Sequence, residues 1–123
     1  MDTSCLTYTS GRNRQMHSQT KIVQPVGILD GIQGTQLRRE VAGLIELGVR
    51  NILIDCTKIN FIDSSGLGAL VTMMKSTKQV NGKFAICSIN DQIRILLELT
   101  SMNKVITIVQ DQDSFLLESP AAS

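Results

Sequence analysis

The sequence of 123 residues has few of the residue types on which many binding and catalytic sites depend. It contains no Trp, one Tyr, three Phe and a single His. Twelve Lys and Arg residues nearly balance eleven Asp and Glu residues, so the net charge is +1. Nucleic-acid binding is therefore not expected, because neither a basic surface nor aromatic side chains for stacking on bases are available. The core must be built from aliphatic side chains.

Cysteine pairs and long apolar runs are also missing. Cys5, Cys56 and Cys87 form no C-x-x-C pair, which argues against a zinc site and a disulfide framework. Cys56 and Cys87 end apolar runs, and we predict that both are small buried side chains. No apolar run approaches the length of a membrane span, and no signal-peptide pattern is found. We predict a cytoplasmic protein that uses no membrane, metal or cofactor.

Strand and helix patterns alternate along the chain. This alternation predicts a single α/β domain in which about four strands form a mostly parallel sheet, packed with about four helices, with a mixed sheet left open. Pro25 lies within the first predicted strand and favours an edge position or an early strand end. Residues 21–30 are predicted to form a strand followed by a turn, and further strands are predicted at 51–56, 83–88 and 105–109; the predicted helices cover about 35–47, 65–79, 91–99 and 113–118. We expect a flexible tail at residues 1–18, the domain at 19–118 and a frayed end at 119–123.

The segment Asp63-Ser64-Ser65-Gly66-Leu67-Gly68 leads into the second predicted helix. Its first three residues are all good N-caps, so the helix should begin among them. The free N–H groups and positive dipole end of a helix start stabilise a phosphate, which makes a serine there a plausible switch. The two glycines would each cost about 1 kcal/mol in a helix. This cost indicates that a packing neighbour or a partner protein approaches the backbone closely; a plain capped core helix is the alternative.

The sequence supplies no complete set of catalytic groups for this segment. Asp63 stands where the G-x-S-x-G pattern of serine hydrolases requires glycine, and the only histidine, His17, lies in the polar tail. Residues 43–48 have the glycine spacing of a P-loop but lack the Lys-Ser/Thr that should follow. Asp30 and Asp63 both follow predicted strands whose ends should meet at one edge of the sheet. Paired carboxylates there can do acid–base work, although a solvated loop rim is commoner. We predict that the protein is not an enzyme.

Residues 61–68, Phe-Ile-Asp-Ser-Ser-Gly-Leu-Gly, resemble the signature of the STAS domain in bacterial anti-sigma factor antagonists. Gly27-Ile28-Leu29-Asp30 and Leu37-Arg38 add to a resemblance that covers about residues 21–118. It implies a protein that, when unphosphorylated, binds an anti-sigma factor that is also a serine kinase, and so frees a sigma factor. The kinase would use ATP to phosphorylate Ser64, with Ser65 as the second choice. A PP2C-type phosphatase would reverse the modification.

The resemblance also implies which residues contact the partner. They are the acceptor and its surroundings: Asp30, Asp63, Ser64, Ser65, Gly66, Leu67 and Gly68. One departure is Ile28, where family members often have an acidic residue. A second function stays open, because STAS domains also serve as accessory or scaffold subunits of other signalling or transport complexes without phosphorylation.

Overall fold

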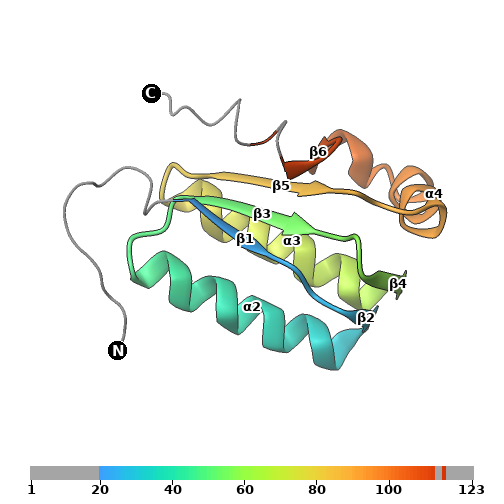
Figure 1. Ribbon diagram of the computed structural model, residues 1–123, viewed down its shortest axis with the longest axis horizontal. Helices are drawn as coiled ribbons and strands as arrows, with labels where there is room; N and C mark the ends of the chain where they lie inside the picture. Colours follow the sequence, from blue (N-terminus) through green and yellow to red (C-terminus); the bar gives the residue numbers. More distant parts are fainter. Residues whose placement is uncertain (1–19, 113–114, 116–123) are drawn as a thin grey trace.

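The computed structural model of the protein describes residues 20–112 and Phe115 (Figure 1). The predicted α/β fold is confirmed, with three α-helices among the described residues. The predicted tail, the frayed end and most of the last predicted helix lie outside those residues. In chain order the elements are β1 (Thr20–Val23), β2 (Gly27–Leu29), α2 (Gly31–Glu46), β3 (Asn51–Asp55), β4 (Ile59–Ile62), α3 (Ser64–Gln79), β5 (Lys83–Cys87), α4 (Asp91–Leu99), the 3-10 turn η2 (Met102–Lys104) and β6 (Thr107–Val109).

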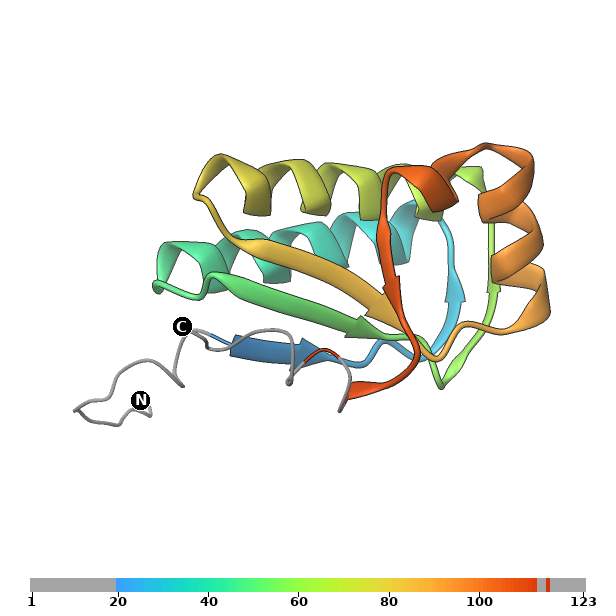
Figure 2. The same cartoon turned by 90° about the horizontal axis from the view of Figure 1, so that it is seen from above.

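The strands form a main sheet and a small second sheet. The main sheet has the order β1-β3-β5-β6, the second sheet contains β2 and β4, and every pairing among the described strands is parallel. Helices α2 and α3 lie side by side on one face of the main sheet, while α4 lies at the end of the molecule where β4 is found (Figures 1 and 2). None of the described helices has the length and apolar character needed to cross a membrane.

Residues 21–30, predicted as one strand followed by a turn, contain two strands that belong to different sheets. Pro25 has no N–H to donate to a ladder, and Gly27 has a φ of 92°, so the chain turns between β1 and β2. Strand β2 then pairs with β4, which lies inside the segment that we predicted as a loop, residues 57–63. Four residues are too few for a periodic pattern to be recognised, so β4 was not predictable in this way.

Helix α2 begins one turn before its predicted start at about residue 35. The side chain of Asp30 caps it, with Oδ1 accepting the N–H of Gln33 at 2.9 Å. Gly31 and Gly34 precede the predicted helix start, but both lie in the first turns of α2. A Cβ on Gly34 would lie 2.9 Å from the Cβ of Ala69. Glycine at this position therefore lets α2 and α3 pack unusually closely.

The core is aliphatic, as predicted. Most of it lies between the main sheet and the two long helices, and a smaller cluster with Phe115 lies on the opposite face of the sheet. Cys56 and Cys87 are both buried with free thiols, which confirms the prediction for them. The side chains that the helices bury in this core include Leu37, Val41, Leu67, Leu70, Met74, Ile93 and Leu97.

Asp55, at the end of β3, is a buried carboxylate with four hydrogen bonds. Its Oδ2 accepts from Nε2 of Gln24 at 3.0 Å and from Nε2 of Gln112 at 2.7 Å. Its Oδ1 accepts from the backbone N–H and the hydroxyl of Thr57. Burial raises the pKa of Asp55, but these hydrogen bonds outweigh burial and lower the pKa from 3.8 to about 2. The carboxylate thus ties the chain between β1 and β2 to the segment after β6.

Acid should therefore weaken the fold through Asp55. Because the folded pKa is below the ordinary value, the stabilisation is present above pH 3.8 and is lost as the pH falls through about 2. We expect the stability advantage of wild type over Asp55→Asn to shrink by about 2 kcal/mol across this range. Urea unfolding followed by circular dichroism at a series of pH values measures it. Parallel pH profiles for the two proteins would contradict the prediction.

Candidate functional site

The N-termini of α2 and α3 lie next to each other because each helix follows one strand of the small sheet. Strands β2 and β4 run parallel, and one residue separates each strand from its helix: Asp30 before α2 and Asp63 before α3. The N–H of Asp63 donates to the carbonyl of Leu29 at 3.3 Å, which holds the two strand ends together. Two positive helix ends therefore face the same region.

Asp63 is the N-cap of α3, which resolves the choice among three candidate cap residues. Its Oδ1 accepts the N–H of Gly66 at 2.8 Å. Asp30 does the same for α2, so each carboxylate that could have formed an acid–base pair has a helix-capping role. Ser64 and Ser65 then occupy the first turn of α3, and both are exposed.

The two serines differ in their surroundings. Ser65 faces α2: a Cβ on Gly31 would lie 3.5 Å from the Cβ of Ser65. Ser65 therefore lies close to the start of α2, although it is exposed. Ser64 is exposed, and its hydroxyl makes no hydrogen bond within the described part of the chain. Of the two serines, Ser64 therefore has the fewer contacts within the described part of the protein.

The two glycines of the motif also differ. A Cβ on Gly66 would overlap the carbonyl oxygen of Leu29 and would lie 2.8 Å from its carbonyl carbon. The predicted close approach at Gly66 is thus a packing contact with β2. Gly68 is exposed, and a Cβ there would have no atom within 4 Å, so packing within the described residues gives no reason for glycine.

The structure brings the seven predicted partner-binding residues together, but it does not expose all of them. Leu67 is only 5% exposed and Gly66 is buried, so these two shape the site from inside. The other five residues present atoms to solvent. Asp30 and Asp63 are half-buried, and the exposed ones are Ser64, Ser65 and Gly68.

Exposed apolar side chains, not predicted from the sequence, lie in the segments that carry these residues. Ile28 and Phe61 are register partners in the small sheet and are 54% and 46% exposed, whereas the next pair, Leu29 and Ile62, is buried. Val26 and Ile32 are also largely exposed. We define the apolar rim as Val26, Ile28, Ile32 and Phe61. Each lies within four residues of Asp30 or Asp63, and exposed apolar side chains gathered in this way are typical of protein contact sites.

Two features of the described residues bear on metal binding and on thiol chemistry. No group of three or more His, Cys, Asp or Glu side chains among them is arranged to hold a metal ion. Burial raises the pKa of Cys56 to about 12 and also raises that of Cys87, so neither supplies a thiolate nucleophile. His17 lies outside the described residues.

The fold and site define a class of protein. It is a small α/β domain with parallel strands, in which an exposed serine directly follows the N-cap of one of two neighbouring helices. Residues 12–114 match the model of the STAS domain, and the chain belongs to the STAS domain family. The anti-sigma F factor antagonist of Paenibacillus polymyxa is 27% identical over 108 residues, covering 87% of this chain and 92% of that protein.

Three solved structures share the fold. A crystal structure from Thermotoga maritima has a TM-score of 0.76 at 24% identity, covering 81% of this chain and 86% of that one. The anti-sigma factor antagonist SpoIIAA in its unphosphorylated form has a TM-score of 0.67 at 18% identity, covering 89% and 96%. SpoIIAA of Bacillus has also been solved in a phosphorylated form, with a TM-score of 0.62 at 20% identity, covering 81% and 91%.

Proposed function

We propose that this protein is an anti-sigma factor antagonist that works by exchanging partners. In its unphosphorylated form it binds an anti-sigma factor with serine kinase activity, and phosphorylation of Ser64 ends the binding. The observation that carries this proposal is the position of Ser64: exposed, in the first turn of α3, beside the Asp63 cap and the start of α2. The relatives that are named anti-sigma factor antagonists support it.

Charge explains how a phosphate on Ser64 would act. The modification adds between about 1.5 and 2 negative charges at neutral pH. The positive ends of α2 and α3 tolerate this charge, so the fold should survive it. A partner that docks apolar or acidic groups beside Asp30 and Asp63 would instead be repelled. The switch therefore acts on the surface that the partner contacts.

The exposed parts of the site suggest how the partner is held. Gly68 leaves helix backbone uncovered, so a partner can approach α3 closely there. The apolar rim supplies area that is removed from water on binding. ATP belongs to the kinase, and a PP2C-type phosphatase would regenerate the binding form. This chain thus serves as ligand and as substrate.

A capture experiment tests the function. Wild type, Ser64→Ala, Ser64→Asp and Ser65→Ala are immobilised and exposed to an extract of the host cells. We expect wild type, Ser64→Ala and Ser65→Ala to retain the same ATP-binding protein, and Ser64→Asp to retain at least about tenfold less, because the added charge lies in the contact surface. With labelled ATP in the extract, Ser64→Ala should lose phosphate incorporation and Ser65→Ala should keep it.

Equal recovery of partners by all four baits would overturn the proposal. Ser64 would then be only a residue of the first helical turn. The protein would act as an accessory or scaffold subunit that phosphorylation does not regulate.

A further inference from the structure

Strand β4 is held on its outer side by a side chain of α4. The Nε2 of Gln92 donates to the carbonyl of Ile62 at 2.8 Å, and its Oε1 accepts the N–H of Ile62 at 2.9 Å. One amide side chain thus pairs with both backbone groups of a strand residue, as a neighbouring strand would. On its other side β4 pairs with β2, which has only three residues.

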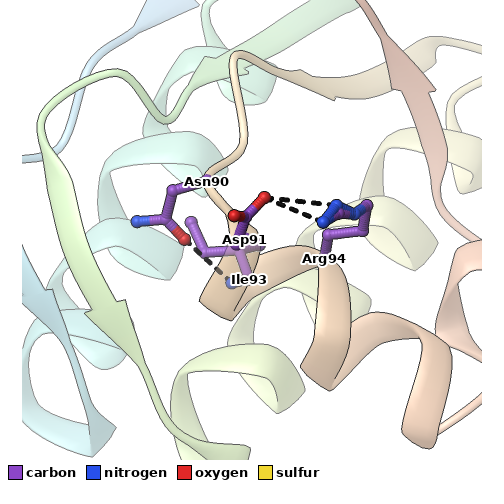
Figure 3. A network of polar contacts seen from close by, with 4 residues as sticks. All are labelled: Asn90, Asp91, Ile93 and Arg94. Atoms are coloured by element: carbon purple, nitrogen blue, oxygen red, sulfur yellow. Dashed lines mark hydrogen bonds and ion pairs between the residues drawn. The ribbon is translucent and has the colours of Figure 1, made fainter.

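A second amide from the start of α4 holds the opposite end of β4. Asn90 caps α4, its Oδ1 accepting the N–H of Ile93 at 2.9 Å (Figure 3). Its Nδ2 donates to the carbonyls of Ile59 at 3.1 Å and Asn60 at 3.3 Å. The exposed ion pair between Asp91 and Arg94 in the same view adds little, because surface pairs of this kind are weak.

Ile62, to which Gln92 is hydrogen-bonded, immediately precedes Asp63, the N-cap of α3. Two-stranded sheets of this size are marginal by themselves, so the position of β4 depends on its contacts with other elements. Gln92 is hydrogen-bonded to Ile62, and the next residue, Asp63, accepts the N–H of Gly66. The peptide bond between Ile62 and Asp63 connects these two sets of hydrogen bonds. Ser64 lies within that turn. Displacement of Ile62 would move the cap and the serine with it.

We propose that Gln92 is a positioning residue for Ser64. The N-terminus of α4 holds β4, and through β4 it sets the orientation of the first turn of α3 that a kinase would meet. The consequence for phosphorylation rests on the proposed function; the positioning itself does not. Gln92 is half-buried, and no sequence motif marks it.

Hydrogen exchange measured by NMR tests the positioning. The reporter is the Gly66 amide, whose N–H donates a hydrogen bond to the Asp63 carboxylate at 2.8 Å. The control reporter is the backbone amide of Gln33, whose N–H donates a hydrogen bond to the Asp30 carboxylate at 2.9 Å in the corresponding turn of α2. Gln92→Leu should speed exchange at Gly66 at least about tenfold and at Gln33 less than about twofold. A purely structural role would raise both rates together.

Two further variants keep the test decisive. Gln92→Glu keeps the size of the side chain. When ionised, its carboxylate can accept the N–H of Ile62 but cannot donate to the carbonyl of Ile62. If Gln92→Leu does not fold, the exchange rates of Gln92→Glu test the positioning instead. Gln79→Leu alters an exposed glutamine near the end of α3 and should leave both amides at wild-type rates. Equal changes at Gly66 and Gln33, or no change at Gly66, would overturn the proposal.

A second readout separates the positioning from the proposed function. Wild type and Gln92→Glu are incubated in host extract with labelled ATP, and phosphate on Ser64 is quantified. We expect labelling of Gln92→Glu to be at least about fivefold slower at unchanged folded content. Equal labelling would overturn the effect on the kinase. Absence of labelling in wild type would count against the proposed function, while the exchange ratio would still decide the role of Gln92.

Discussion

Gly66→Ala should destabilise the protein by about 2–4 kcal/mol. The new Cβ would overlap the carbonyl oxygen of Leu29 and crowd Cγ1 of Ile62, which lies 3.1 Å from the Cβ position. The principal obstacle is the backbone of β2, which cannot rotate aside as a flexible side chain could. The gain of about 1 kcal/mol in helix propensity is too small to compensate. Urea unfolding monitored by circular dichroism measures the difference.

Gly68→Ala is the matched control, two residues further along the same helix. No atom lies within 4 Å of its Cβ position, so the substitution should stabilise the fold by about 0.5–1 kcal/mol through helix propensity and chain entropy. Similar destabilisation by both substitutions would contradict our account of Gly66. A stabilised Gly68→Ala that binds the captured partner more weakly would identify the bare backbone at this position as a contact.

The double variant Ile28→Thr/Phe61→Thr should bind the captured partner about a hundredfold more weakly. These two side chains are register partners of the apolar rim beside Ser64, and both are exposed. A partner that covers them would bury apolar area that threonine cannot replace. Threonine retains a good strand propensity, so the free energy of unfolding should change by less than about 1 kcal/mol.

Isothermal titration with the protein retained by the wild-type bait gives the affinities. Leu47→Thr/Ile108→Thr is the control, because it removes two exposed apolar side chains from the end of α2 and from β6. We expect wild-type affinity for this control. Equal weakening by both double variants would mean that binding responds to general surface hydrophobicity and that the rim is not a specific contact.

The features that could be predicted from the sequence are those that depend on neighbouring residues. The start of α3 was placed correctly within the segment of residues 63–68, because the capping residues that mark a helix start are a local signal. The buried cysteines followed from their place at the ends of apolar runs. The family resemblance rested on the same short segment and is supported by the match over residues 12–114.

The features that were missed depend on contacts between distant residues. Strand β4 is defined by its pairing with β2, and the exposed side of Phe61 depends on that register. The early start of α2 depends on the fit of Gly34 against Ala69 in α3. Gln92 lies thirty positions from the residue that it holds, and a glutamine near a helix start has no distinctive pattern.

The close packing of Gly66 against Leu29 bears on how long the phosphorylated state would last under the proposed function. Helix α3 packs closely on β2 at this point, so we expect the helix to keep one arrangement whether or not Ser64 carries a phosphate. Under the proposed function, the only memory of the switch is the covalent phosphate ester. The duration of the inactive state is then set by how often the phosphatase meets the protein, and relaxation of the chain contributes nothing to it.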